Sequence, residues 1–261
     1  LAIYEAGKLR NAQGNTVPAT LFHLFGLVDG LGISYTTRIS AGSTFLTMSI
    51  GMPIAHVALD FPDRLQAGID RFGFADPYIQ PIRLGWRHER ADIVTSYGIY
   101  LPTGRSNLAG GKGVSSGGFT HEFSGGGSVY FKDRSRFVTA LTSYQMYTRQ
   151  RGIDVRRGDT LQVQGGVGTK VLGESGETGL ASYALWQTRD HSGTALPAAL
   201  RTARDRVFGV GPEAAVMLKP IRAQIRIRYE WDLGVRARPQ GHIFVAGITF
   251  LVRSAPARGR R

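Results

Sequence analysis

Cysteine is absent from the 261-residue sequence, which excludes a disulfide scaffold and any metal centre built on thiolates. Long hydrophobic runs are absent as well. The longest, 243–252, has the length of a strand, and none approaches the roughly 18 apolar residues that indicate a membrane-spanning helix. The chain begins at Leu1 with no secretory hydrophobic region. We therefore expect a mature form or a fragment, from which the export signal cannot be read.

Acidic residues are few beside basic ones, with 19 Asp and Glu against 32 Lys and Arg, a net charge of +13. The excess is almost entirely arginine, spread along the chain rather than gathered on one segment. Such a balance is compatible with nucleic acid, anionic lipid or anionic solutes, and it does not choose among them. The six histidines show no HExxH or other ligand spacing, so we expect neither a metal nor a cofactor.

One stretch, 223–236, alternates strictly between two kinds of residue. Successive side chains of a strand point to opposite faces, so the stretch predicts a strand with one apolar and one charged face. It exceeds the roughly 9–11 tilted residues that cross a bilayer. The apolar set, which we expect to face lipid, is Ala223, Ile225, Ile227, Tyr229, Trp231, Leu233 and Val235; the set expected to face a wet lumen is Gln224, Arg226, Arg228, Glu230, Asp232, Gly234 and Arg236.

Twelve strand-like segments follow one another along the chain, and their connections alternate between short and long. The segments are 1–9, 19–39, 45–59, 78–86, 93–101, 119–132, 136–147, 160–171, 178–188, 207–218, 223–235 and 243–252. We expect a short helix in the long link 60–76, and bulges or local breaks at Pro81 and Pro212, because proline removes a ladder donor.

This order of turns predicts an all-β fold: a single transmembrane, antiparallel, up-and-down β-barrel of about twelve strands, with short periplasmic turns and long extracellular loops. A soluble β-sandwich also alternates in hydropathy, but it rarely gathers every long loop at one end. We expect the barrel to occupy 1–252, and 253–261 to form a basic, disordered, periplasmic tail.

Four local motifs add a resemblance to a known family. GFADPYIQPIRLGW (73–86), YGIYLPTGR (97–105), RDRVFGVGPE (204–213) and RARPQGH (236–242) resemble recurrent blocks of the SphA-like family of the MetA pathway of phenol degradation. The similarity covers nearly the whole chain. It implies a porin-like channel or transporter in the outer membrane of a Gram-negative bacterium, for passive uptake of phenolic or other aromatic compounds.

The sequence departs from that family at both ends. Members usually have a further N-terminal stretch, so we expect the first strand to be truncated. They also tend to end on an aromatic residue, whereas Phe250 is followed by LVRSAPARGRR.

Charged and amide side chains on the expected inner face are the candidate solute path. On the strand 223–236, neighbouring members lie about 6.7 Å apart. One interpretation is a ladder that steers an anionic or polar solute; the other is a structural network in which carboxylates of neighbouring strands neutralise the arginines. The candidates are Arg38, Arg83, Glu122, Gln162, Gln164, Glu213, Arg226, Arg228, Glu230 and Asp232, with Glu122 and Glu213 as the natural counter-charges.

Two other functions remain open at this stage. Asp190, His191 and Ser192 resemble part of a hydrolase triad at the rim, although no nucleophile elbow accompanies them. A soluble, basic β-sandwich that binds nucleic acid is the other alternative, although the sequence contains no nucleic-acid-binding motif.

For the barrel we expect membrane lipid, lipopolysaccharide and a small hydrophobic or anionic aromatic solute as partners. We expect no nucleic-acid partner and no enzymatic activity, and the sequence does not predict the oligomeric state. Four extracellular arginines either pair with lipid phosphates or are ordinary solvated loop charges: Arg149, Arg151, Arg156 and Arg157.

Overall fold

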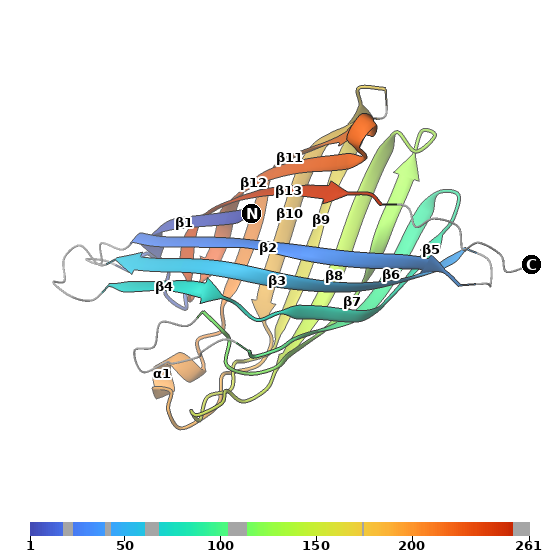
Figure 1. Ribbon diagram of the computed structural model, residues 1–261. Helices are drawn as coiled ribbons and strands as arrows, with labels where there is room; N and C mark the ends of the chain where they lie inside the picture. The colour runs from blue at the N-terminus through green and yellow to red at the C-terminus, as the bar shows by residue number, and fades with distance from the viewer. Residues whose placement is uncertain (18–22, 40–42, 61–67, 104–113, 174, 253–261) are drawn as a thin grey trace, which may run out of the picture.

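The computed structural model describes residues 1–17, 23–39, 43–60, 68–103, 114–173 and 175–252. Strands make up nearly all of its regular structure (Figure 1). They are β1 (Ala2–Leu9), β2 (His23–Arg38), β3 (Thr44–Asp60), β4 (Ile69–Phe74), β5 (Tyr78–Arg87), β6 (Ala91–Tyr100), β7 (Thr120–Phe131), β8 (Arg136–Tyr147), β9 (Thr160–Val171), β10 (Gly176–Gln187), β11 (Arg206–Leu218), β12 (Ala223–Arg236) and β13 (Pro239–Phe250). One helical turn, α1 (Ala198–Arg201), and one 3-10 turn, η1 (Lys219–Ile221), complete the list. Within these residues no helix has the length and apolar character needed to span a membrane.

The strands form one closed antiparallel sheet. Each strand from β5 to β13 pairs with its neighbour in sequence, β1 pairs with both β2 and β13, and β3 joins β2 to β5. Twelve strands therefore close the barrel, and β4 is an addition that pairs with β3 alone. The predicted fold is confirmed, and the soluble sandwich is wrong because a single sheet closes on itself.

The link between β3 and β5 corrects one prediction. A short helix was expected in 60–76, but the described part contains β4, which pairs with the outer half of β3 from Ile54↔Phe74 to Leu59↔Ile69. From Asp70 to Phe74 exposed and half-buried residues alternate, as the two faces of a strand require. Residues 61–67 lie outside the described residues, as do 18–22 of the predicted second strand and the predicted tail 253–261.

The connections sort onto the two ends of the barrel. One end, the short-turn rim, carries the turns 88–90, 132–135, 172–175 and 219–222, and β13 ends toward it, whereas Leu1 lies midway along the barrel wall beside Ala246 (Figure 1). The other end, the long-loop rim, carries the connections 101–119, 148–159 and 188–205. One connection at the long-loop rim is short: only Ala237 and Arg238 join β12 to β13, where a link 237–242 was predicted.

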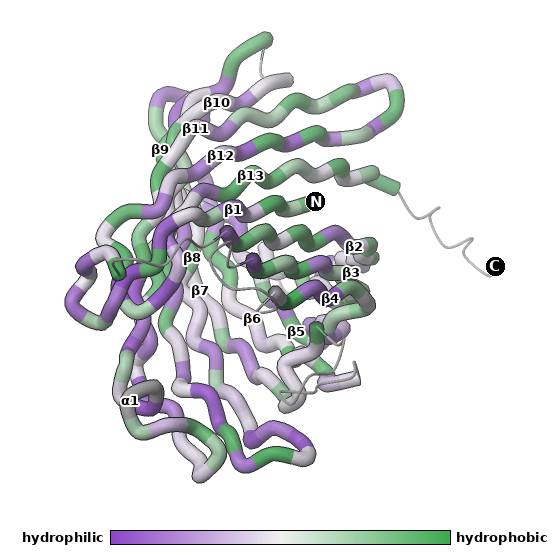
Figure 2. The backbone as a smooth tube through the Cα atoms, turned by 90° about the vertical axis from the view of Figure 1, so that its left-hand side faces the viewer, coloured by the Kyte–Doolittle hydropathy of each residue, from purple (hydrophilic) through white to green (hydrophobic). Residues whose placement is uncertain are grey.

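Alternation along β12 determines what faces outward and inward. Ile227 and Trp231 are 48% and 50% exposed on the outer surface, whereas Glu230 and Asp232 are 3% and 4% exposed inside the barrel. Figure 2 shows the alternation of hydrophilic and hydrophobic residues along β12. The assignment of an apolar outer face and a charged inner face is correct for this part of the strand.

The end of β12 breaks the alternation. Gly234 adopts a φ of 56°, and the register with β11 shifts between Phe208↔Leu233 and Arg206↔Arg236. A bulge of this kind inserts one extra residue and reverses the facing beyond it. Val235, predicted to face lipid, is consequently 4% exposed, whereas Arg236, predicted to face the lumen, is exposed.

Both prolines predicted to interrupt strands do so. At Pro81 the register of β5 shifts against both β3 and β6. At Pro212 the ladder between β11 and β12 omits two successive pairs and then resumes in the same register at Glu213↔Arg228. Each position lacks a backbone N–H to donate to its neighbour.

β1 is short compared with its neighbours. Its pairing reaches only Ala2↔Val28 on one side and Ala2↔Val245 on the other. The described residues therefore place no strand between Gly30–Arg38 of β2 and Gly247–Phe250 of β13. Leu31, on this stretch of β2, is 86% exposed.

Candidate functional site

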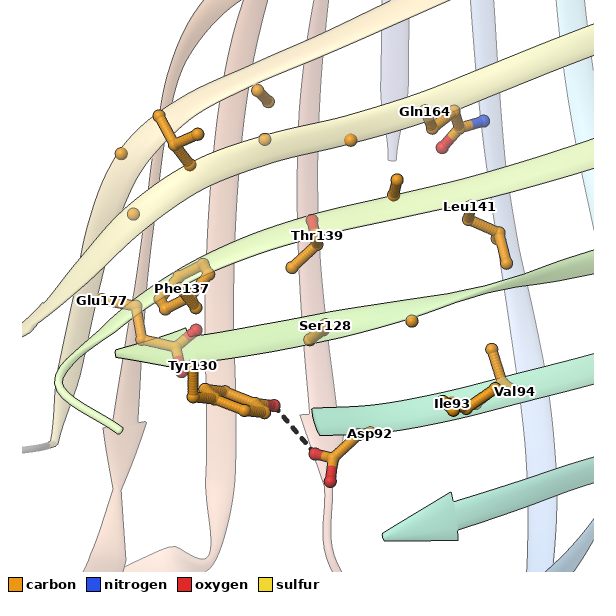
Figure 3. Close-up of a pocket in the computed structure, with 18 of the residues that line it drawn as sticks. Asp92, Ile93, Val94, Ser128, Tyr130, Phe137, Thr139, Leu141, Gln164 and Glu177 are labelled. Carbon is orange, nitrogen blue, oxygen red and sulfur yellow. Dashed lines mark hydrogen bonds between the residues drawn. The ribbon is translucent and has the colours of Figure 1, made fainter. Parts of the chain in front are cut away.

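A cavity of about 740 Å³ occupies the half of the lumen nearer the short-turn rim. Residues of β2, β3 and β5 to β12 line it, because the closed sheet turns one face of every strand inward. Figure 3 shows part of this wall, where Tyr130 of β7 donates a 2.8 Å hydrogen bond to Asp92 of β6. Five of the predicted path residues line the cavity: Arg83, Gln164, Glu213, Arg226 and Arg228.

A charged network crosses one side of the cavity. Glu213 of β11 accepts hydrogen bonds from Arg226 at 2.5 Å and from Nε of Arg228 at 2.7 Å, both on β12. Glu177 of β10 lies 3.5 Å from Arg226. Glu230 lies 3.8 Å from Arg228, and its second oxygen is buried without a hydrogen-bond partner among the described residues. The two arginines are thus neutralised across three strands, as the structural interpretation expected.

Arg83 stands apart from this network on the opposite wall. It lies on β5, is exposed to the cavity, and forms no ion pair with a carboxylate in the described part of the chain. Arg38, at the end of β2, is also exposed, and it too forms no ion pair with a carboxylate among the described residues. It lies at the short-turn rim rather than along the cavity. Arg83 is consequently the cation most available to a solute.

The half of the lumen nearer the long-loop rim contains hydrogen-bonded side chains that reach inward from several strands. Asp232 of β12 accepts from Tyr4 at 2.7 Å, from Tyr183, and from the backbone N–H of Gly241 at 3.1 Å. These contacts connect β1, β10, β12 and β13 across the inside of the barrel.

A second cluster fills the other side of the same half. Glu122 of β7 accepts from Tyr78 at 3.0 Å and from Gln145 at 2.7 Å, and Tyr147 donates to the Gln145 oxygen at 2.7 Å. Gln162 lies near this level on β9, where it pairs with Ser143 and Leu185. Glu122 therefore accepts hydrogen bonds from neutral donors and has no arginine partner among the described residues, unlike the predicted role of counter-charge.

Burial separates the two halves of the lumen. The polar residues of the described strands that are at most 9% exposed all lie in the long-loop half. They are Gln80, Thr120, Ser143, Thr160, Gln187, Glu230 and Asp232. The short-turn half instead holds the open cavity. The lumen thus has an open cavity near the short-turn rim and, toward the long-loop rim, a layer of hydrogen-bonded tyrosines and carboxylates, which we call the constriction.

The sequence did not indicate the tyrosines of the constriction. Tyr4 lies in a strand with irregular alternation, and 183–186 fits neither a clean inward nor a clean outward pattern. A signal is present in the neighbours of Tyr183: Ala181 and Gly179, two and four residues earlier, are small and face inward. Small residues next to a large ring are what a narrow lumen requires.

The rim residues considered for a hydrolase do not converge. Asp190 is bound by Arg204 at 2.7 Å, and Nδ1 of His191 accepts a hydrogen bond from the backbone N–H of Gly158 at 3.0 Å. The backbone of Ser192 pairs with Arg156. Among the described residues, no hydrogen bond connects the three members of the predicted triad. Asp190, His191 and Ser192 therefore do not have the arrangement of a hydrolase triad. The described residues also contain no cluster of three or more potential metal ligands.

The closed sheet, its apolar outer face and its charged interior define a transmembrane β-barrel of the outer-membrane type. A family model described as "Putative MetA-pathway of phenol degradation" matches residues 6–246. The chain belongs to this family, and the resemblance inferred from the four motifs is confirmed.

Two solved structures are similar to the chain. One is the crystal structure of an outer membrane channel from Pseudomonas putida F1, with a TM-score of 0.78 and 11% identity, covering 95% of this chain and 93% of that one. At this identity the likeness concerns the fold. The other is OmpT, an outer membrane protein of Vibrio cholerae, with a TM-score of 0.43 and 7% identity, covering 94% of each chain. No curated protein sequence is significantly similar. The predicted location, the outer membrane of a Gram-negative bacterium, agrees with the closed sheet and its apolar outer face.

Proposed function

We propose that the protein is a passive channel for small aromatic molecules, phenolic compounds among them. The observation that carries the proposal is the charged cavity of about 740 Å³ inside a closed transmembrane barrel. Small-molecule sites commonly have about 300–1,000 Å³, so a single aromatic ring fits here with room to move. Family membership supports a role connected with phenol degradation.

The path runs from the long-loop rim, through the constriction, to the cavity. In the constriction a solute meets phenol rings and carboxylates whose charge is already satisfied by Tyr4, Tyr78 and Tyr183. An aromatic ring can stack against such side chains without the loss of a charged partner. In the cavity, Arg83 attracts an anionic or electron-rich solute. Passage requires no catalytic residue and no cofactor.

The neighbours proposed for the outer surface are membrane lipid and lipopolysaccharide, and we propose no nucleic-acid partner. The net charge of +13 favours anionic partners, but the arginines are divided among lumen, turns and loops rather than collected on one nucleic-acid-binding face. We therefore propose that the positive charge attracts the anionic membrane surface and anionic solutes.

Planar-bilayer conductance of the refolded protein tests the proposal. We expect single-channel events that are partly blocked by benzoate. Arg83→Gln should weaken the benzoate effect up to about fivefold, the factor that corresponds to roughly 1 kcal/mol for an exposed charge pair. Arg136→Gln is the matched control, because it removes the same charge near the same rim from the outer surface. The absence of any conductance, or equal responses of the two variants to benzoate, would count against the proposal.

A further inference from the structure

Two arginines lie directly opposite one another on the outer surface at the long-loop rim. Arg206 begins β11, and its Cα pairs with that of Arg236 at the end of β12. The guanidinium of Arg206 lies over the ring of Phe208, 5.2 Å from its centroid. Phe208 faces outward, because the adjacent Val207 is 1% exposed in the interior. Both arginines are thus on the membrane side of the barrel wall.

Neither arginine has a carboxylate partner among the described residues. Asp205, next to Arg206 in sequence, is paired with Arg238 at 3.5 Å. Of the four loop arginines expected to meet lipid phosphates, Arg149 and Arg156 are paired with Asp154 and Asp159. Arg151 and Arg157 lie over the rings of Phe119 and Tyr147, as Arg206 lies over Phe208, but in the described part of the chain neither of them is paired with a second arginine on an adjacent strand. Like charges on directly opposed strand residues destabilise their pairing. An anion between Arg206 and Arg236 would remove this repulsion.

An apolar surface continues below the two guanidinium groups toward the membrane centre. Phe208 packs edge-to-face against Trp186 at 5.5 Å. Leu233, which pairs with Phe208, and Trp231 are each 50% exposed on the same outer face. Exposed tryptophans of this kind mark the interface between hydrocarbon and headgroups. A ligand for this surface must therefore carry an anionic head above an apolar body.

We propose that Arg206 and Arg236 bind a phosphate of lipid A, the membrane anchor of lipopolysaccharide, while its acyl chains lie on Phe208, Trp231 and Leu233. Guanidinium groups match phosphate oxygens with paired hydrogen bonds, and the long-loop rim of such barrels faces the lipopolysaccharide leaflet. The site lies on the outside of the wall, so it is independent of the solute path proposed for the lumen.

Tryptophan fluorescence of the refolded full chain provides a direct assay. The chain has three tryptophans, Trp86, Trp186 and Trp231; Trp86 lies at the opposite rim, so Trp86→Phe leaves only the two beside the site. Bisphosphorylated lipid A, fully dephosphorylated lipid A and sodium phosphate are titrated separately into the protein in detergent. We expect saturable binding of bisphosphorylated lipid A, much weaker binding of the dephosphorylated form, and no competition by inorganic phosphate at millimolar concentration.

Arginine variants then locate the binding. Replacing either arginine by glutamine should weaken lipid A binding about fivefold, because one basic residue near an anionic lipid surface contributes about this factor to the affinity. Replacing both should weaken binding about 25-fold. Arg136→Gln, an exposed outer-face arginine at the other rim, should have no effect. Because Arg206 packs on a ring, the single variant Arg236→Gln keeps the test valid if the double variant folds poorly; heat-dependent gel mobility reports folding of each.

Three results would overturn the proposal. Unchanged affinity in Arg236→Gln and in the folded double variant would remove the arginines from the site. Equal affinity for phosphorylated and dephosphorylated lipid A would mean that only the apolar surface binds. Displacement of lipid A by inorganic phosphate would indicate a site for free anions. None of these results bears on conductance, so they leave the channel proposal to its own test.

Discussion

The phenol oxygen of Tyr4 donates a 2.7 Å hydrogen bond to the carboxylate of Asp232, which connects β1 to β12 past the intervening β13. Tyr183 donates to the other carboxylate oxygen from β10. The carboxylate has no salt bridge in the described part of the chain, so phenols and one backbone N–H satisfy it inside the barrel. This contact holds together the seam where the first and last strands meet.

Asp232→Asn should destabilise the barrel by roughly 1.5–3 kcal/mol, the contribution of hydrogen bonds to a charged group. The amide keeps one acceptor oxygen and puts an NH2 group in place of the other, so that a donor faces either Tyr183 or Tyr4 and the Gly241 N–H, which already donate. The measurement is the urea midpoint of folding into lipid vesicles. Asp133→Asn, in an exposed turn with a φ of 53° that asparagine tolerates, is the control. Equal midpoints for the two variants would show that the phenol contacts are dispensable.

The facing of β12 could be predicted because a single rule governs it. Side chains alternate with a period of two, and in a membrane barrel a shift by one residue would move every charge into lipid. The hydropathy of 223–233 was therefore sufficient to predict that Ile227 faces out and Arg226 faces in. The rule fails at Gly234, because a bulge is a property of backbone conformation and register with β11, and hydropathy carries no information about it.

The contents of the lumen were predictable only in part. Asp232 and Glu122 were predicted to face inward, but their tyrosine partners were not identified. A tyrosine ring suits a membrane interface as well as a lumen, so its polarity does not determine its facing. Which strands lie across from each other inside the barrel depends on closure and stagger, and a single sequence provides neither.

Ile227→Arg should impair membrane insertion far more than Arg226→Ile. Ile227 is 48% exposed on the lipid side, and an arginine at mid-depth there costs about 2–4 kcal/mol. Arg226→Ile removes one partner of Glu213, but Arg228 still neutralises that carboxylate. Folding yield into vesicles, followed by gel mobility, compares the two. Equal yields would contradict the assigned facing.

Glu213→Gln should make the channel more selective for anions. This carboxylate neutralises Arg226 and Arg228 at the cavity wall, and its loss leaves their charge exposed to the solute path. The reversal potential across a tenfold KCl gradient should shift toward the chloride potential. Glu177→Gln is the matched variant with a smaller expected shift, since Glu177 lies 3.5 Å from Arg226 and does not contact Arg228. An unchanged potential in Glu213→Gln would place conduction away from this wall.

Two loops at the long-loop rim should separate as the pH falls. They meet where Arg156 and Ser192 pair through their backbones, beside the hydrogen bond from Gly158 N–H to Nδ1 of His191. Burial lowers the pKa of His191 below its usual 6.5, and the nearby Arg157 lowers it further. A lowered pKa means that the neutral ring stabilises the folded loops above about pH 6.5, and that this contribution is lost as the pH falls toward the folded-state pKa. Protonation of Nδ1 also removes the acceptor for Gly158.

Hydrogen exchange of the peptide containing 156–159 measures this opening between pH 7.5 and 5, after correction for the intrinsic pH dependence of exchange. Protection should decrease over this range in the natural chain and stay constant in His191→Gln, which cannot titrate. The neighbouring contact of Asp154 with Thr194 is an internal reference: the Thr194 backbone N–H, followed by its hydroxyl, lowers the pKa of Asp154, so this carboxylate stays ionised throughout the range. The same loss of protection in His191→Gln would assign the opening to a different group, because only the imidazole at this junction changes charge between these pH values.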